Sequence, residues 1–455
     1  MDITAEAIPA SVRALLDRLW AHGQAAYVVG GSLRDVLLGR EPADWDLTTD
    51  ARPDRVLAIF PGSVYENRFG TVAVRDGDEV HEITTFRTDH DYADFRRPHR
   101  VEFGDRLEDD LARRDFTINA MAWGAAAAAP SRVAPPALVD PFGGGPDLER
   151  RLLRAVGEPS KRFEEDALRM VRAVRLAATL GFEIEPTTLA AIRAHAPLVR
   201  HLSGERIAAE LEKLLAAERP SVGLRLAAQT GMLEVISPDL AAQRGIAQNK
   251  VDGEDLWDHT LRSVDAAPAS RPVVRLAAFL HDIGKPATID DGPFRGHETL
   301  GAEIAADFLD RLHMPKAVID RVVHLVRQHM FTYDPDWGDA GIRRFIKRVG
   351  RASLDDLFAL RAADSVGSGL PADAGRVDEL RRRVEEQLAA AAVLDRSGLA
   401  IDGSDLMTEL GVPQGPTLGR ILDRLLERVI ADPALNDRAS LLLMSEAMLA
   451  DEGDG

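Results

Sequence analysis

One short segment of the chain combines residue types that suit metal-assisted phosphate chemistry. Asp44 and Asp46 are separated by a single residue, and on a short strand alternate side chains point to the same face. Two such carboxylates repel each other unless a cation lies between them, and Mg²⁺ prefers oxygen ligands. Upstream, Gly30 and Gly31 would let a phosphate approach the start of a helix, where Arg34 could add a charged contact. The alternative is a surface Asp-x-Asp beside an ordinary strand, turn and helix.

Further residues could complete a site of this kind. Glu82 lies in the strand-like segment HEITTFR, and Arg114 precedes another strand-like segment in RRDFTINAMAW. Carboxylates on adjacent strands could hold two metal ions, which activate an attacking oxygen and stabilise a leaving pyrophosphate. We therefore interpret Asp44, Asp46 and Glu82 as candidate catalytic residues.

Four charged residues of the segment EEDALRMVRAVR follow one another at intervals of three: Asp166, Arg169, Arg172 and Arg175. Three-residue steps place neighbouring side chains on one helical face, opposite an apolar stripe. On spacing alone, an amphipathic helix with an i,i+3 ion pair explains the pattern equally well.

The stretch from 256 to 370 gathers side chains that bind metals. A single histidine on an apolar helix is usually structural, but a His-Asp pair followed by IGK, with a histidine upstream and an aspartate downstream, indicates a site. The chain has no cysteine, so any metal must be held by histidine and carboxylate. That donor set suits Mn²⁺, Ni²⁺ or Co²⁺ better than Mg²⁺. The residues of this pattern are His259, His281, Asp282 and Asp364, and the same block contains His297 and His329.

Hydrophobic patterning predicts a mixed α/β head followed by helices. Residues 11–21 are amphipathic, AAYVV is typical of a strand, and 71–87 alternates around DGD as in a hairpin. From 147 the pattern is helical, with a break near 231–255. We therefore predict a head over 1–146, a neck over 147–230, a helical block over 250–370 and a helical tail over 377–455.

Composition excludes several classes of protein. The chain of 455 residues is 45% hydrophobic and 29% charged, as in a globular protein of about three domains. No apolar run approaches the ~18 residues that span a bilayer, and the N-terminus has acids where a signal peptide has bases. We expect a cytoplasmic protein without a membrane partner, and infer no protein partner. The net charge of −18 argues against a passive nucleic-acid coat, although local basic patches are compatible with it.

The ordered motifs GGxxRD, DxD, ExTTFR and RRDFTINA resemble those of class II tRNA nucleotidyltransferases and bacterial poly(A) polymerases, within the polymerase-beta nucleotidyltransferase superfamily. The resemblance continues through DPFGGGPDLERRLLRAVG, RFEEDALRMVRAVR and GERIAAELEKLL. It implies an α/β polymerase-beta-like head followed by a mostly α-helical body. It also implies a tRNA substrate, CTP and ATP as nucleotide donors, and Mg²⁺ held by Asp44 and Asp46.

The resemblance also implies roles for the charged neck residues. In that family, the residues matching Asp166 and Arg169 read the Watson–Crick edge of the incoming nucleotide without a nucleic-acid template. Cytosine and adenine carry an amine where uracil and guanine carry a carbonyl, so one such pair could accept CTP and ATP alone. By the same resemblance, Arg114, Arg172 and Arg175 hold phosphates or shape the pocket.

The histidine-rich block resembles the HD phosphohydrolase superfamily. There the first histidine, the His-Asp pair and the last aspartate bind a divalent metal, which implies His259, His281, Asp282 and Asp364 as ligands, and His297 and His329 match the extra ligands of two-metal members. His313 and His324 match no ligand position and are interpreted as structural. The alternative is an HD fold kept only as a scaffold. The tail, with AIDGSDLMTELGVPQGPTLGRILDRL, resembles the RNA-binding tail of the same nucleotidyltransferases; plain packing of helices explains it equally well.

We expect the chain to add CCA to tRNA 3′ ends, with phosphohydrolase activity of the HD block as an accompanying hypothesis. Poly(A) polymerases share the head and neck, but carry a GRRF-type stretch where this chain reads ENRFGTVAV at 66–74. The loop over 87–103 is intact, as expected for an enzyme that adds the terminal A. In a third hypothesis the HD block is the enzyme and the head only binds RNA; the intact set Asp44, Asp46 and Glu82 argues against it.

Overall fold

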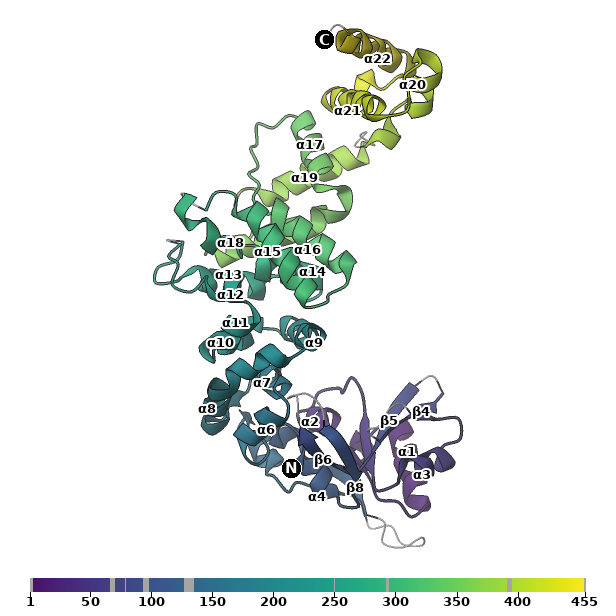
Figure 1. Cartoon of the computed structure of the whole chain (residues 1–455), viewed down its shortest axis with the longest axis vertical. Coiled ribbons are helices and arrows are strands. Elements are labelled where there is room, and N and C mark those ends of the chain that lie inside the picture. Colours follow the sequence, from purple (N-terminus) through teal and green to yellow (C-terminus); the bar gives the residue numbers. More distant parts are fainter. Residues whose placement is uncertain are drawn as a thin grey trace. The chain divides into compact units, whose positions relative to one another are not determined.

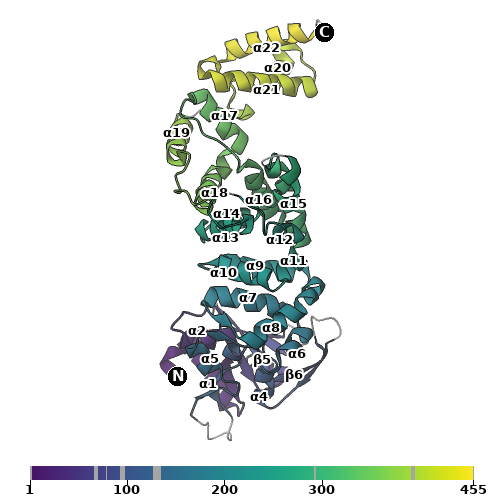
Figure 2. The same ribbon diagram turned by 90° about the vertical axis from the view of Figure 1, so that its left-hand side faces the viewer.

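The computed structural model describes residues 3–65, 70–77, 79–92, 98–126, 135–248, 250–291, 294–390 and 395–453. These residues form two compact units (Figures 1 and 2). The first contains Met1–Ala241 and Arg311–His313, and the second contains Ala242–Asp310 and Met314–Gly455. Within the described ranges, none of the helices combines the length and the apolar character that crossing a bilayer requires.

A seven-stranded sheet forms the centre of the head in the described part of the first unit, in the order β3-β4-β5-β2-β1-β8-β9. The pair β2 and β5 is parallel, and all other neighbours are antiparallel. The predicted hairpin within 71–87 is confirmed as β4 and β5. The strands are β1 (Ala26–Val29), β2 (Asp46–Thr49), β3 (Val64–Tyr65), β4 (Thr71–Asp76), β5 (Glu79–Thr85), β8 (Ala122–Ala125) and β9 (Ala137–Val139).

Strand β1 is buried along its whole length because both faces of the sheet are covered there. Tyr27 and Val29 pack with Phe86 and Leu107 in a core on one face, as the two-residue period of a strand requires. The indole of Trp20, on the predicted N-terminal helix, donates to the Ala26 carbonyl. The head helices are α1 (Ala10–Ala21), α2 (Gly30–Leu37), α3 (Pro53–Ile59), α4 (Leu107–Ala112) and α5 (Gly144–Glu149).

The neck is helical apart from the short parallel pair β10 (Leu152–Leu153) and β11 (Glu183–Ile184). Helices α9 and α10 both pack against α7, and Figures 1 and 2 show them side by side next to it. A Cβ on Gly223 of α10 would lie 2.5 Å from Leu214 Cδ1 and 2.7 Å from the Val174 carbonyl, so only glycine allows this approach. The helices are α6 (Pro159–Glu165), α7 (Leu168–Leu180), α8 (Pro186–His195), α9 (Gly204–Leu215), α10 (Pro220–Gln229), α11 (Met232–Ile236) and α12 (Pro238–Ala241).

The second unit is helical in its described residues. Its last three helices enclose a core of their own, built around Leu406, Leu425 and Leu441. The helices are α13 (Leu256–Ala266), α14 (Pro272–Leu280), α15 (His297–Arg311), α16 (Lys316–Gln328), α17 (Asp339–Val349), α18 (Leu354–Gly367), α19 (Val377–Ala389), α20 (Gly403–Leu410), α21 (Pro416–Ala431) and α22 (Arg438–Gly453).

Two segments that bear on the function lie partly outside the described residues. These are 66–69, within the stretch that differs from poly(A) polymerases, and 93–97, within the loop that follows Glu82. Within the loop predicted over 87–103, the strands β6 (Arg87–Tyr92) and β7 (Pro98–Phe103) pair antiparallel. The division of the chain into head, neck, HD block and tail stays a prediction.

Candidate functional site

The head carboxylates lie at one edge of the sheet, beside the start of α2. Asp46 opens β2; its register partners are Glu82 on β5 and Val29 on β1. The parallel register therefore brings two distant carboxylates side by side. Asp44 precedes the strand in a bend and is exposed, so the expectation that both aspartates share a strand is wrong for Asp44. The physical reason is that β1 ends at Val29, where the chain enters α2 and pairing stops.

Gly30, at the junction of β1 and α2, allows Arg114 and Asp46 to approach the backbone closely. Its φ of +77° is one that side chains rarely adopt, and a Cβ there would lie 2.9 Å from Arg114 Nη1 and 3.4 Å from Asp46 Oδ2. Burial raises the pKa of Asp46, and the charge of Arg114 opposes that shift. The Arg114 Nε is buried without a hydrogen-bond partner within the described ranges. This corner thus offers a carboxylate and a free donor to a ligand that carries both cation and phosphate.

The oxygen donors of the head fit a hard divalent cation. Among the described residues, sets of three or more potential ligand atoms within 4.8 Å of one another occur only in the second unit. The carboxylate oxygens of Asp44, Asp46 and Glu82 therefore do not all lie within 4.8 Å of one another. After burial, the charge of Asp44 also raises the pKa of Asp46, as expected for neighbouring carboxylates.

A chain of polar contacts connects α2 to the neck. Arg34 donates to Asp35 at 2.9 Å and to Asn119 Oδ1 at 2.7 Å, and Asn119 donates in turn to Asp115 at 2.9 Å. Arg172 on α7 donates to the other oxygen of Asp115 at 2.9 Å. Arg34 is thus held by protein partners, and Asp115 joins the head to the neck.

Asp115 is ionised in spite of its burial. Burial alone would raise the pKa of Asp115, but the charge of Arg172 and the hydrogen bonds from Asn119 and Arg172 hold it well below its usual range. The carboxylate in turn raises the pKa of the Arg172 guanidinium. Arg172 also approaches Glu210 of α9 at 3.6 Å, and Arg175 donates to the same carboxylate. Arg172 and Arg175 therefore tie α7 to its neighbours.

Asp115→Asn is expected to lower the free energy of unfolding by about 2–3 kcal/mol. This loss is smaller than the loss from breaking a fully buried ion pair, because Arg172 is half-buried. A depressed pKa stabilises the fold fully above the unfolded value of about 3.9, and this contribution is lost as pH falls below it. Urea unfolding at pH 7 and at acidic pH measures both effects. The control Asp17→Asn removes an exposed carboxylate of α1. An unchanged urea midpoint at pH 7 would contradict the assigned role.

Asp166 lies outside the helix that carries the three arginines. Helix α6 ends at Glu165 and α7 begins at Leu168, and Asp166 between them has an extended backbone with φ of −147°. The prediction of one continuous helical face is therefore wrong for Asp166. The physical reason is a local turn, in which the Asp166 carboxylate accepts from the Leu168 N–H at 3.0 Å instead of extending the helix.

Arg169 does not contact the Asp166 carboxylate through its side chain. Its guanidinium donates to Glu165 at 2.7 Å and to the backbone carbonyls of Arg113 and Arg162 at 2.8 and 3.2 Å. The side chain is buried by these contacts, which tie the neck to the head.

The partner of Asp166 is Arg206 of α9, which sequence reasoning missed. Arg206 Nη2 donates to Asp166 Oδ2 at 2.7 Å, and Arg206 Nη1 is buried without a partner within the described ranges. Together they present a carboxylate and a free donor on one side of the neck. A single arginine carries little information in an arginine-rich chain. The signal that could have identified Arg206 was its position within the motif GERIAAELEKLL.

The second unit brings all six candidate metal ligands together. Asp282 is central: its Oδ2 lies 3.2 Å from both His259 Nε2 and His281 Nε2, and its Oδ1 lies 3.3 Å from His297 Nε2. Asp364 Oδ1 lies 3.3 Å from His259 Nε2. One set contains His259, His281 and Asp282, and the other contains Asp282, His297 and His329.

The hydrogen bonds of these histidines fit a cation. The Nδ1 atoms of His281, His297 and His329 lie 2.6–2.8 Å from backbone carbonyl oxygens, and a ring that donates its Nδ1–H there turns its Nε2 lone pair inward. The Nε2 atoms of His259 and His281 are 3.1 Å apart, and those of His297 and His329 are 3.2 Å apart. Lone pairs and carboxylate oxygens that face one another in a buried site repel each other unless a positive charge lies between them.

Cations also line the cavity that opens onto this cluster. The cavity has a volume of about 470 Å³, and Lys250, Lys285 and Arg361 lie on its wall. Lys285 donates to Asp282 at 2.7 Å; burial would raise the pKa of Asp282, but His281 and Lys285 hold it well below its usual range. The cluster thus pairs a metal-type donor set with positive charge suited to an anionic ligand.

The two remaining histidines of this region belong to neither ligand set. His324 Nε2 lies 2.7 Å from the Val349 carbonyl oxygen, which fixes its ring between helices. His313 is exposed.

Known protein families match successive parts of the chain. The poly A polymerase head domain matches residues 26–154, the probable RNA and SrmB-binding site of polymerase A matches 181–244, and the HD domain matches 253–368. The polymerase-beta-like head followed by a helical body, expected from the motifs, is confirmed. The fold and the two clusters therefore define a nucleotidyltransferase that carries an HD domain.

Relatives cover nearly the whole length of the chain. The CCA-adding enzyme of Geobacillus thermodenitrificans is 35% identical, and that of Geobacillus stearothermophilus 33%, each over 93% of both chains. The crystal structure of the Bacillus stearothermophilus CCA-adding enzyme in complex with CTP superposes with a TM-score of 0.71 at 30% identity, covering 98% of this chain and 100% of that one. The chain belongs to the family of CCA-adding enzymes.

Proposed function

We propose that this protein adds CCA to the 3′ end of tRNA from CTP and ATP, with Asp44, Asp46 and Glu82 as the catalytic carboxylates. The observation that carries the proposal is the pairing of Asp46 with Glu82 beside Gly30 and the unpartnered Nε of Arg114. Asp44 and Asp46 would hold Mg²⁺. When bound, the divalent cation supplies positive charge that favours attack by an RNA hydroxyl and departure of pyrophosphate. Gly30, Gly31 and Arg114 admit and hold the phosphates.

The neck selects the nucleotide. Asp166 accepts from the exocyclic amine that cytosine and adenine share, and a guanidinium donates to the neighbouring ring nitrogen or carbonyl. We assign that donation to Arg169 on the family motif alone, since its guanidinium here donates to Glu165 and to backbone carbonyls. Arg206 positions the Asp166 carboxylate. Arg172 and Arg175 shape the pocket by fixing α7 against Glu210.

The deciding experiment incubates the protein with tRNA that lacks its 3′ CCA and with each nucleoside triphosphate separately. CTP alone should add two residues, and ATP should then add one. A long adenylate tail would instead indicate a poly(A) polymerase. Incorporation of none of the four would overturn the assignment of the head as catalytic. A cytoplasmic location stays a prediction from the sequence.

Asp166→Ala is expected to reduce discrimination against UTP by about 10–100-fold while slowing CMP addition less, because about 1–3 kcal/mol of base recognition is lost. The measurement is the ratio of kcat/KM for CTP and UTP on the same tRNA. Glu164→Ala is a matched control, since Glu164 is exposed and pairs with His195. If the variant rejects UTP as strictly as the wild type, base reading lies elsewhere.

We further propose that the histidine cluster is a two-metal phosphohydrolase site. The specific observation is that Asp282 faces both ligand sets, while Lys250, Lys285 and Arg361 line the adjoining cavity. Imidazole-rich sites favour Mn²⁺, Ni²⁺ or Co²⁺ over Mg²⁺. A phosphate ester fits the positive wall of the cavity, and the bound metals supply the charge needed for its hydrolysis.

A further inference from the structure

The two ligand sets of the histidine cluster share Asp282 but use different oxygens of it. Asp282 Oδ2 lies 3.2 Å from the Nε2 atoms of both His259 and His281, and these three residues are here called the first set. The buried ammonium group of Lys285 donates to this same oxygen at 2.7 Å. Lys285 and a metal ion in the first set would therefore compete for one carboxylate oxygen.

Two further cations border the first set. Asp364 Oδ1 lies 3.3 Å from His259 Nε2, so this carboxylate faces the first set as well. Its Oδ2 accepts from Arg361 at 3.2 Å, and Lys250 Nζ lies 4.0 Å from its Oδ1. Both carboxylates that a metal ion would use here are thus already paired with positively charged side chains. Because like charges repel most strongly where water is excluded, these side chains oppose the binding of a further cation.

The second set, made of Asp282, His297 and His329, has the opposite surroundings. Asp282 Oδ1 lies 3.3 Å from His297 Nε2 and 3.7 Å from His329 Nε2. A further carboxylate lies beside these rings, since Glu298 Oε2 is 3.6 Å from His297 Nδ1. His297 and His329 also line the cavity of about 470 Å³, whereas the histidines of the first set do not. The second set is therefore open to the cavity and surrounded by charge that favours a cation.

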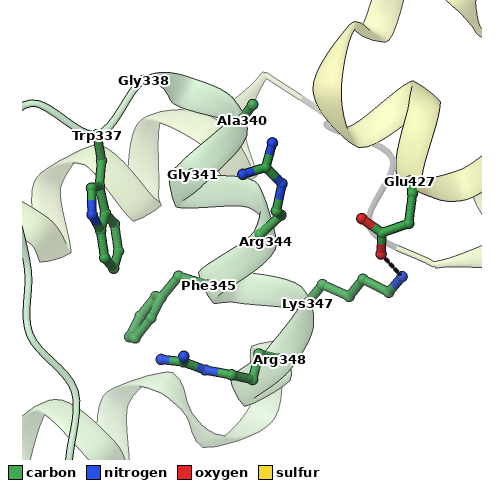
Figure 3. A pocket seen from close by; sticks show the side chains of 9 residues that line it. All are labelled: Trp337, Gly338, Ala340, Gly341, Arg344, Phe345, Lys347, Arg348 and Glu427. Atoms are coloured by element: carbon green, nitrogen blue, oxygen red, sulfur yellow. Dashed lines mark hydrogen bonds and ion pairs between the residues drawn. The ribbon is translucent and has the colours of Figure 1, made fainter.

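Cations line another cavity of the second unit, but without metal ligands. This cavity of about 800 Å³, between α17 and α21, presents Arg344, Lys347 and Arg348 (Figure 3). Its lining residues include no histidine and one carboxylate, Glu427, which pairs with Lys347 at 2.6 Å. Of these two cavities, only the one at the histidine cluster joins cations to the carboxylates of a metal-type donor set.

We propose that Lys250, Lys285 and Arg361 bind a phosphate group beside the first set, and that this anion and the metal ion of the first set bind cooperatively. The second set binds its metal ion without the anion. The physical reason is an exchange of partners: when Asp282 and Asp364 turn to the metal ion, the phosphate replaces them as the partner of the three cations. The inference rests on the proposed two-metal site, and the phosphate group is that of an ester or of the free product.

The test measures binding of Mn²⁺ to the full-length protein from the electron paramagnetic resonance signal of the free ion. Without phosphate, one ion should bind tightly and a second at least about tenfold more weakly. Inorganic phosphate should strengthen the weaker ion at least about tenfold, relative to sodium chloride of equal ionic strength, and Mn²⁺ should strengthen phosphate binding by the same factor. Phenylphosphonate, in which a P–C bond replaces the ester bond, is the second probe. An effect of both probes identifies an ester as the ligand, and an effect of phosphate alone identifies the free product.

Substitutions in the two sets assign each ion to its position. His329→Gln should remove the tight ion, because His329 belongs to the second set alone. His259→Gln should remove the weaker ion and, with it, the effect of phosphate on metal binding. A tight ion that is lost in His259→Gln and kept in His329→Gln would overturn the inference.

Substitutions of the cations test the linkage itself. Lys250→Met with Lys285→Met should strengthen the weaker ion in the absence of phosphate and abolish the effect of phosphate. The control is Lys316→Met with Lys347→Met, two lysines of the same unit outside this cavity wall that change the net charge equally. Arg361→Gln, at a half-buried side chain, changes the fold less and should act in the same direction as the double variant.

The remaining outcomes separate this inference from the proposed hydrolysis. Two Mn²⁺ ions of equal affinity without phosphate, or a phosphate effect that sodium chloride reproduces or that persists in the cation variants, would overturn the inference. If the wild type binds phosphate and Mn²⁺ cooperatively but hydrolyses no phosphoester, the inference stands and the proposed hydrolysis fails. Hydrolysis without cooperative binding has the reverse meaning.

Discussion

Asp46→Asn is expected to reduce incorporation of both CMP and AMP at least about 10³-fold, because a metal ligand acts on a step in which several kcal/mol of charge stabilisation is at stake. The two nucleotides should be affected alike, since Asp46 lies in the head and the residues that read the base lie in the neck. Affinity for tRNA should stay within about twofold, because it rests on spread phosphate contacts. Single-turnover extension of tRNA and filter binding measure the two quantities.

Asp54→Asn is the matched control, because Asp54 is an exposed carboxylate of α3 in the same head. Asp44→Asn should behave as Asp46→Asn does, since the metal needs both oxygens. Equal losses of tRNA binding and of catalysis would defeat the assignment. A loss restricted to AMP addition would move Asp46 from the chemical step to nucleotide selection.

For the head, the sequence identified which carboxylates belong to the site, but it did not predict all of their positions. Alternating hydrophobicity identified the strand that carries Glu82, and a parallel neighbour is what places it beside Asp46. The position of Asp44 could not be predicted, because the length of β2 depends on where β1 ends. That end is set at Gly30 by its positive φ and by the close approach of Arg114, which is a non-local contact.

Nucleotide selection shows the limit of periodicity. The three-residue spacing is real for Arg169, Arg172 and Arg175, but a local hydrogen bond from the Leu168 N–H to the Asp166 carboxylate accompanies a turn that leaves Asp166 outside the helix. Its partner Arg206 comes from another helix, so no local pattern could pair the two. Propensity and spacing describe one helix at a time, whereas this site depends on how α9 packs against α7.

The histidine cluster was predictable as a set because its residue types are rare and their chemistry is specific. The sequence could not show that Asp282 faces both ligand sets, nor that the Nδ1 atoms of three rings lie against backbone carbonyls. Carbonyl positions depend on where helices end, and His281 and His329 each follow the last residue of a helix.

Asp282→Asn is expected to weaken binding of Mn²⁺, Ni²⁺ or Co²⁺ more than about 100-fold, since loss of only an outer partner costs ~10–100-fold. Both ligand sets lose the same carboxylate, so the metal content of the purified protein should fall at both positions together. Hydrolysis of small phosphoesters should fall with it. CMP and AMP incorporation should stay within a few-fold of wild type, because the nucleotide site is built from residues of the other unit.

The control variant is Asp307→Asn, because Asp307 is an exposed carboxylate of α15 in the same unit. Metal content is measured on the folded full-length chain of each variant. If only one metal position is lost, Asp282 does not serve both sets. If the wild type, freed of contaminating phosphatase, binds none of these metals and hydrolyses nothing, the cluster is a scaffold held by polar contacts. If Asp282→Asn instead abolishes CCA addition while the chain stays folded, the two sites are coupled. That coupling would have to be indirect, because no side chain of the cluster belongs to the nucleotide site.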